Sequence, residues 1–519
     1  MFGKQKVLAG ILGITVMAAG LFGCQAPGAE ESEKNGSVSA VALAEYPKEP
    51  VYKNDSDRYE NRKEIPEDFL TAYKGFFMET GSALFKDSKE NIIYSPLSFY
   101  YALAFAAGGA SGDTREELLH TLRYSYVEDL SADCKAAFEA LYHVPNEKNG
   151  KDRDSGEYFP ESRYSFTMAS SLWADETLEV KKEFADYGAA YFYGDTYSVD
   201  FGAPETGKAM AEWVKERTGG ILEPAAAVPE NMVLSLKNTV YFYDEWMDKF
   251  EKDNTREDSF KKADGETVIC EFMNRTMSSH GFRKGETFTM SSLALKNGTM
   301  EFYLPDEGVD VHEFFKNPDT LYEVMEGRDG AEMGEVVWKI PKFSYGSSLE
   351  FATLLKNLGV EGAFREDADF TGISDSSPLF FSAVTQDAHI GIDENGVEAA
   401  AYTEISWAGA AMPVGRADMI LDRPFFYVIK NRGQVIFMGI LLATAVWVNR
   451  NIEIKGLYMD DLYFWSCYGE QGFLQYVFPL GSTRFRFLYY LAAWLEMAVV
   501  GNHVNWFVPF NILLNTAVS

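Results

Sequence analysis

Hydrophobic and polar positions along the chain follow the two periods of regular secondary structure. Their spacing predicts helices over residues 66–85, 101–107, 206–218 and 351–358. It predicts strands over residues 169–174, 233–242, 300–304, 336–340 and 379–392. Residues 424–429 and 435–442 flank Asn431-Arg432-Gly433, an arrangement that predicts a hairpin. Because helices and strands are mixed without strict βαβ alternation, the pattern favours the α+β class.

Residues 394–413, ENGVEAAAYTEISWAGAAMP, carry two conflicting signals. The segment Glu398-Ala399-Ala400-Ala401 has the composition of a helix, and the Ala-Gly-Ala-Ala-Met-Pro end is typical of a loop. Alternate positions are nevertheless small or apolar, as in a strand with one buried face: Val397, Ala399, Ala401, Thr403, Ile405 and Trp407. From the pattern alone, a helical turn followed by a surface loop and a strand both remain open.

The N-terminus has the pattern of an export signal. Lys4 and Lys6 precede an apolar run over residues 7–21, which Phe22-Gly23-Cys24 follows. This arrangement resembles a bacterial lipoprotein signal, so residues 1–23 are predicted to be removed and Cys24 to carry the lipid. An ordinary signal peptide and an uncleaved anchor are the alternatives, and each also exports the protein. We therefore expect the protein to be anchored to the outer face of the bacterial cell membrane.

Composition divides the rest of the chain into three parts. Residues 24–60 start with the lipidated Cys24 and are rich in Pro, Gly, Glu, Ser and Lys, which predicts a flexible tether. Residues 61–445 have the mixed pattern of a globular domain. Residues 446–519 form an aromatic, membrane-like tail of uncertain origin, but its apolar runs over 487–500 and 504–518 are shorter than the ~20 residues of a membrane span.

Charge and cysteine usage exclude several classes of function. The 78 acidic residues outnumber the 47 basic ones and give a net charge of −31, which argues against nucleic acid as the main partner. The four cysteines, Cys24, Cys134, Cys270 and Cys467, lie far apart without paired spacing, so neither a metal site nor a disulfide framework is predicted. No cofactor is expected, and no nucleophile–base set indicates an enzyme. Asp460-Asp461 faintly resembles the acidic pair of polytopic glycosyltransferases, but nothing supports it.

Several motifs, in order, carry a family resemblance. They are Asn91-Ile92-Ile93-Tyr94-Ser95-Pro96-Leu97-Ser98, Asn238-Thr239-Val240-Tyr241-Phe242 with Trp246, Leu304-Pro305-Asp306-Glu307-Gly308, Pro341-Lys342-Phe343, and Asp393-Glu394-Asn395-Gly396-Val397-Glu398-Ala399-Ala400-Ala401. Together with Arg423-Pro424-Phe425-Phe426 they resemble the serpins over residues 61–444. The resemblance implies the α+β serpin fold, with three β-sheets, about eight or nine helices and an exposed reactive-centre loop.

The resemblance also implies roles for individual residues. The hinge of the reactive loop corresponds to Glu394, Gly396, Val397, Glu398, Ala399, Ala400 and Ala401. A polar cluster that controls opening of the central sheet corresponds to Ser95, Ser98, Asn238, Trp246 and Gln386. Two positions depart from the family: Val397 stands where Thr or Ser is usual, and Gln386 where His is frequent. Val suits a buried strand position, and Gln can both donate and accept hydrogen bonds.

The implied function is suicide inhibition of a serine protease by a monomer, in which the cleaved loop inserts into the central sheet. Counting fifteen residues from Gly396 ends at Ala410, so the scissile bond is predicted to be Ala410–Ala411, within about two residues. The neighbouring side chains are small, which predicts an elastase-like partner with a shallow S1 pocket. The alternative is a non-inhibitory serpin that acts as a cell-surface binding protein.

Overall fold

The computed structural model describes residues 10–19, 38–47, 63–142, 165–218, 232–375, 378–397 and 415–443. The predictions at Cys24, Glu398, Ala399, Ala400, Ala401, Ala410, Ala411 and residues 446–519 lie outside these ranges. The described residues form eight α-helices: α2 (Glu67–Phe85), α3 (Pro96–Gly109), α4 (Gly112–Thr121), α5 (Val127–Leu141), α6 (Lys182–Tyr191), α7 (Pro204–Arg217), α8 (Pro318–Glu326) and α9 (Ala352–Asn357). None of these helices is both long and apolar enough to cross a membrane.

The strands of the described residues form two sheets. The eight-stranded sheet contains β12 (Phe343–Glu350), β13 (Leu379–Ile392), β1 (Gly10–Ala19), β14 (Gly396–Val397), β6 (Met232–Glu245), β4 (Ser165–Asp175), β5 (Gly194–Val199) and β2 (Val38–Ala42). The nine-stranded sheet contains β15 (Gly415–Ile420), β11 (Ala331–Pro341), β7 (Arg256–Lys261), β8 (Thr267–Lys284), β9 (Phe288–Ala294), β10 (Gly298–Pro305), β16 (Phe425–Asn431), β17 (Gln434–Leu441) and β3 (Ile92–Tyr94).

The long strand β8 explains why two sheets are found where three were expected. The first residues of β8, Thr267 to Phe272, pair with β7, and most of the rest of the strand, Phe272 to Arg283, pairs with β11. Its last residues, Phe282 to Lys284, pair with β9. One strand of 18 residues therefore joins the expected second and third sheets into a single hydrogen-bonded ladder. The α+β class and the number of helices agree with the prediction.

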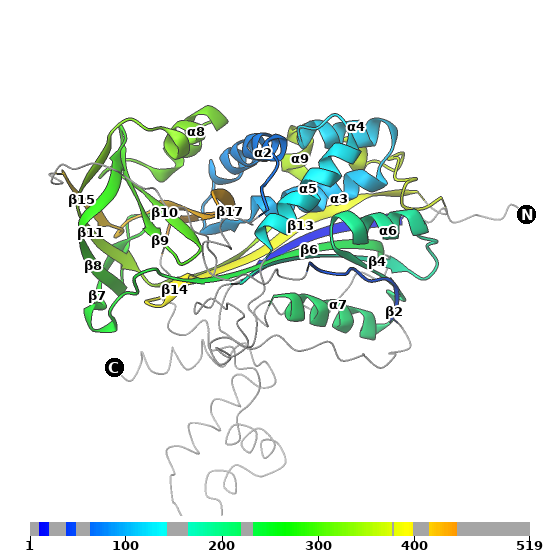
Figure 1. The fold of residues 1–519 in the computed structure, drawn as a ribbon, viewed down its shortest axis with the longest axis horizontal. Helices are drawn as coiled ribbons and strands as arrows, with labels where there is room; N and C mark the ends of the chain where they lie inside the picture. Colours follow the sequence, from blue (N-terminus) through cyan, green and yellow to red (C-terminus); the bar gives the residue numbers. More distant parts are fainter. Residues whose placement is uncertain are drawn as a thin grey trace, which may run out of the picture. The chain divides into compact units, whose positions relative to one another are not determined.

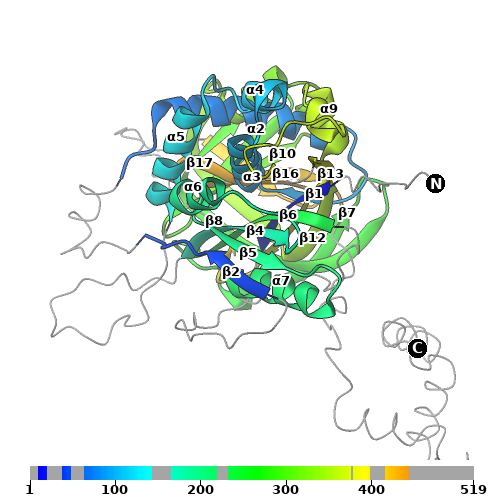
Figure 2. The same cartoon turned by 90° about the vertical axis from the view of Figure 1, so that its right-hand side faces the viewer.

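Helix α3 forms the core on one face of the eight-stranded sheet. Its sequence, PLSFYYALAFAAGG, carries no charged residue, and all but one of its residues are buried. The Ser95 side chain caps the helix by accepting from the Ser98 backbone N–H, and Pro96 occupies the first turn, where no N–H is needed. Helix α7 lies on the opposite face of this sheet (Figures 1 and 2). The eight-stranded sheet therefore has helices packed on both of its faces.

Residues 38–47 differ from the predicted flexible tether. Strand β2 pairs antiparallel with β5, and the Ala44 backbone N–H donates to Asp195 Oδ1 at 3.0 Å. Tyr46 stacks on Tyr193 and donates its hydroxyl to the Tyr193 carbonyl at 3.1 Å. The buried Asp195 carboxylate also accepts from Arg217 on α7 at 3.1 Å. This short segment becomes ordered because distant residues supply its hydrogen-bond partners.

Strand β1 lies between β13 and β6 and runs parallel to both. Its register extends from Gly10 opposite Leu379 to Ala18 opposite Ala388. The strand belongs to the segment that is predicted to be removed on export, and that removal stays a prediction. The pairing shows that the two strands β13 and β6 can accept a further strand between them along most of their length.

Candidate functional site

The hinge predicted from sequence starts where β13 ends. After a turn at Asp393–Asn395 the chain enters the sheet again as β14, which pairs antiparallel with β13 through Ile392 and Val397. On its other side, β14 pairs with β6, with Val397 opposite Asp244. The Val397 side chain is fully buried. A Cβ atom at Gly396 would lie 2.3 Å from the Asp244 carbonyl oxygen, so only glycine fits this close approach.

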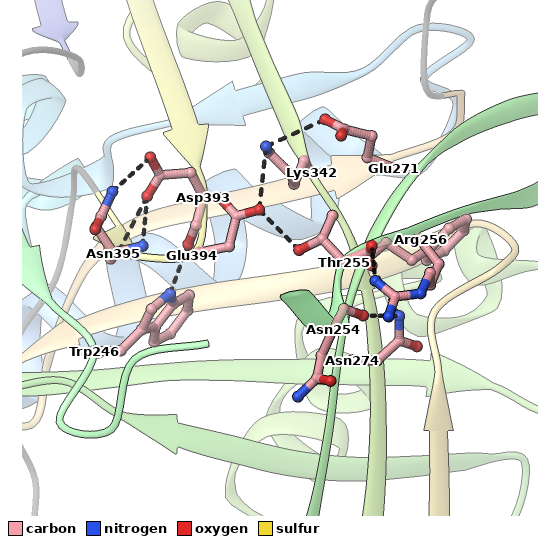
Figure 3. Close-up of polar contacts among 12 residues, drawn as sticks. Trp246, Asn254, Thr255, Arg256, Glu271, Asn274, Lys342, Asp393, Glu394 and Asn395 are labelled. Carbon is pink, nitrogen blue, oxygen red and sulfur yellow. Dashed lines mark hydrogen bonds and ion pairs between the residues drawn. The ribbon is translucent and has the colours of Figure 1, made fainter. Parts of the chain in front are cut away.

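Trp246 holds the turn between β13 and β14. Its indole N–H donates to the Asp393 carbonyl at 2.8 Å, and its backbone N–H donates to the Asn395 carbonyl at 3.0 Å (Figure 3). Asn395 in turn donates its backbone N–H to the Asp393 carboxylate at 2.7 Å. Trp246 is only 1% exposed, so the burial of its indole ring stabilises the turn in addition to these hydrogen bonds. The indole therefore fixes the point from which the hinge departs.

Glu394 anchors the same turn to the nine-stranded sheet. Its carboxylate accepts from Thr255 Oγ1 at 2.8 Å and lies 3.3 Å from Lys342 Nζ, which also pairs with Glu271 (Figure 3). Burial alone would raise the pKa of Glu394, but hydrogen bonds from its own backbone N–H and Thr255, with the charge of Lys342, lower it below its ordinary value. Glu394 is therefore ionised at neutral pH and links two sheets.

The polar cluster predicted beneath the central sheet is brought together, except for one member. Gln386 accepts from the Ser95 backbone N–H and donates to the Ser95 carbonyl, both at 2.9 Å. Ser98 donates to Asn238 Oδ1 at 2.7 Å. All four side chains are fully buried. Trp246 lies at the hinge instead, because the eight residues after Asn238 advance an extended chain by about 26 Å.

Two residues of the site were missed by sequence reasoning. Ser170 of β4 accepts from Asn238 Nδ2 at 2.9 Å and extends the polar cluster across the sheet. Asp244 of β6 is fully buried beside the hinge and accepts from the backbone N–H groups of Asn297 at 2.7 Å and Glu245 at 2.9 Å. The available signal was alternation, since Asp244 continues the buried series of Leu236, Asn238, Val240 and Phe242.

The buried carboxyl group of Asp244 is expected to make the stability of the folded protein depend on pH. Burial is the largest influence on this residue and raises the pKa of its carboxyl group to about 7, although hydrogen bonds from Asn297 and Glu245 act in the opposite direction. Between about pH 4 and pH 7 the folded protein therefore keeps a proton on Asp244 that the unfolded chain has released. This proton binding stabilises the folded state at low pH, and the contribution is lost as the pH rises towards 7. Between pH 5 and pH 8 we expect a loss on the order of 2–3 kcal/mol.

The measurement is urea-induced unfolding at both pH values, with Asp244→Asn as the matched variant. The amide keeps the shape and an acceptor but does not titrate in this range. We expect the variant to lose most of the pH dependence between pH 5 and pH 8. Parallel stability profiles for the two proteins would show that Asp244 is not the responsible group.

Comparisons with known proteins agree with this architecture. A family model described as Serpin (serine protease inhibitor) matches residues 71–444. Alpha-1-antiproteinase of Rattus norvegicus is 26% identical over 349 residues, which cover 66% of this chain and 80% of that protein. The crystal structure of the thermophilic serpin Tengpin in its native state aligns at 27% identity with a TM-score of 0.61, covering 74% of this chain and 96% of Tengpin. A thyroxine-binding globulin complex with thyroxine, 21% identical, shares the fold with a TM-score of 0.59 over 73% and 99% of the two chains.

Proposed function

The chain belongs to the serpin family, and we propose that it inhibits serine proteases as a suicide substrate. A protease attacks the segment between β14 and β15 and forms an acyl-enzyme. The cleaved segment then inserts between β13 and β6 before hydrolysis is complete and carries the protease with it. The observation that supports this most is β14, because Val397 already pairs with both strands and Gly396 pairs with β6.

The register of β14 supports the predicted length of insertion. Continuing the antiparallel pairing of Ile392 with Val397 would bring Ala410 opposite Leu379, because Leu379 lies thirteen positions before Ile392 and Ala410 lies thirteen positions after Val397. Leu379 is the first residue of β13, so the inserted strand would use this strand fully and end at the predicted scissile bond, Ala410–Ala411. Strand β1 occupies this position in the chain with residues 1–23. We propose that removal of the export signal makes the position accessible to the loop.

The side chains that would enter the sheet suit burial. In an inserted strand, alternation would put Ala399, Ala401, Thr403, Ile405 and Trp407 on the same face as the buried Val397, and none of these residues carries a charge. About ten to fifteen new backbone hydrogen bonds at roughly 1 kcal/mol each, with the burial of the apolar side chains, give on the order of 10–20 kcal/mol. A typical domain is stable by about 5–15 kcal/mol, so insertion is sufficient to distort a protease.

Partner and location follow from the same proposal. The small residues around Ala410 and Ala411 fit a serine protease with a shallow S1 pocket, as in elastase, whereas a trypsin-like enzyme needs Arg or Lys. Cys24 would hold the protein at the outer face of the bacterial membrane through its lipid. The inhibitor would then protect the cell surface from proteases in its surroundings.

The test is to incubate the exported, processed protein with pancreatic elastase and to analyse the mixture by denaturing gel and mass spectrometry. We expect an adduct that resists SDS and a released peptide that starts at Ala411. Cleavage without an adduct, and without a rise in the melting temperature of the cut protein, would count against inhibition and favour a binding protein. Trypsin is the control protease, because it needs Arg or Lys at the cleaved bond and the predicted bond, Ala410–Ala411, offers neither.

A further inference from the structure

A polar depression of about 480 Å³ opens where β7, β8 and β11 lie side by side in the nine-stranded sheet. It is lined by Asn254, Arg256, Asp258, Asn274, Thr276 and Lys339, together with Arg275. Three of these residues are basic and one is acidic, whereas acidic residues outnumber basic ones by 78 to 47 in the whole chain. The depression is therefore a locally positive site on a strongly negative protein.

The depression lies beside the hinge from which the reactive-loop segment departs. On one side, Thr255 donates to the Glu394 carboxylate at 2.8 Å, just before the hinge (Figure 3). On the other side, strand β11, which carries Lys339, pairs with β15, the strand that follows the loop and starts with Gly415 opposite Gly334. A protease bound to the loop has to approach the molecule next to the hinge and these strands. Its surface would therefore come close to the depression.

Most of the charges that line the depression already have partners within the protein. Lys339 Nζ lies 2.5 Å from Asp258 Oδ2 and 4.6 Å from the ring centre of Phe272. Arg275 Nη2 lies 3.2 Å from Asp248 Oδ2. These contacts neutralise two of the three basic side chains and hold them in place.

Arg256 differs from the other two basic residues. It is exposed, and its guanidinium donates to the neighbouring Thr255 carbonyl at 2.7 Å. Within the part of the chain that the structure describes, no carboxylate lies at ion-pair distance from it. Beside it, Asn274 donates to the Asn254 carbonyl at 2.9 Å and fixes the rim (Figure 3). Arg256 therefore offers unused N–H donors in the planar geometry that matches a carboxylate.

We propose that Arg256 and this depression form a docking site for an acidic segment on the surface of the target protease, beside its active site. The proposal rests on the proposed inhibitory function and adds a second determinant of specificity to the loop sequence. A chain of net charge −31 repels an acidic protease, and a positive site at the point of approach offsets this repulsion. The site would act mainly on the rate of encounter rather than on the insertion step.

The test compares two proteases with shallow S1 pockets, one of net negative and one of net positive charge. The quantity measured is the second-order rate constant for total loop cleavage, counting adduct and released product together, at about 0.05 M and about 0.5 M salt. For the acidic protease, Arg256→Glu should lower this rate constant about tenfold at low salt and much less at high salt. Arg256→Lys should keep most of the rate, and the basic protease should not be slowed.

Lys89→Glu provides the matched control, because it makes the same change in net charge at an exposed position between α2 and β3. We expect it to leave the rate constant for the acidic protease within about twofold of the unchanged protein. The docking proposal is overturned if Arg256→Glu leaves that rate unchanged, slows both proteases equally, or acts no more strongly than Lys89→Glu. A protein that is cleaved without any adduct would instead refute inhibition, and the cleavage rates would still test docking.

Discussion

A glutamate in place of Val397 is expected to convert the protein from an inhibitor into a substrate. Val397 is fully buried between β13 and β6, and it lies directly opposite Asp244. Because Val397 is buried before cleavage, a glutamate would leave this position in the intact protein. Insertion of the loop would then have to bury the new carboxylate next to an existing carboxyl group, at a cost of about 3–5 kcal/mol. A barrier raised by this amount slows insertion by at least about 100-fold, which gives hydrolysis of the acyl-enzyme time to finish.

The measurement for Val397→Glu is the fraction of elastase that is trapped as an SDS-resistant adduct for each loop cleaved. Val397→Thr is the matched control, because threonine has nearly the same shape and its hydroxyl carries no charge. We expect this control to trap protease about as well as the unchanged protein. If the glutamate variant trapped protease with the same yield, Val397 would not belong to the part of the loop that inserts.

Loss of the Gln386 side chain is expected to cause the largest fall in stability of any single change in the polar cluster. Its amide joins β13 to the start of α3, because it bonds to both the N–H and the carbonyl of Ser95, 291 residues away. Gln386→Ala would leave the Ser95 N–H buried without its partner and would open a small cavity. Together these effects should lower the free energy of unfolding by about 3–4 kcal/mol.

The midpoint of urea-induced unfolding and the half-life of inhibitory activity at elevated temperature both report this change. Gln386→His tests the hydrogen bond separately, since an imidazole ring fills part of the space and can accept from the Ser95 N–H. We expect the histidine variant to recover at least half of the stability that the alanine variant loses. Equal losses for both variants would assign the effect to packing rather than to hydrogen bonding.

The local pattern of hydrophobic and polar residues predicted helices and strands well where it followed one period clearly. The expected helix over residues 66–85 is α2 (Glu67–Phe85), and the expected strand over residues 379–392 is β13 (Leu379–Ile392). Strand β8 was missed, because its sequence, TVICEFMNRTMSSHGFRK, mixes polar and apolar residues without regular alternation. Its 18 residues pair with three different strands, and none of these partners covers its whole length.

The sequence predicted which residues belong to the candidate site better than it predicted how they are arranged. Family motifs pointed to Ser95, Ser98, Asn238 and Gln386, which the fold brings into one hydrogen-bonded group. They also grouped Trp246 with this cluster, although it holds the hinge turn instead. Asp195 gave no local sign of its role, because an aspartate in a sequence is ordinarily expected on the surface. For Asp244 the one local signal was the alternation of buried positions along β6.

The sequence by itself determined the structural features that depend only on residues close together along the chain. The uncharged run of α3 with its Ser95 cap is one case, and Gly396 at the start of the hinge is another. Only the tertiary structure decided that β14 lies between β13 and β6, that β2 covers the edge of β5, and that Arg256 lacks an acidic partner among the described residues. Burial, strand pairing and charge pairing arise between residues that are far apart along the chain, and no local pattern records them.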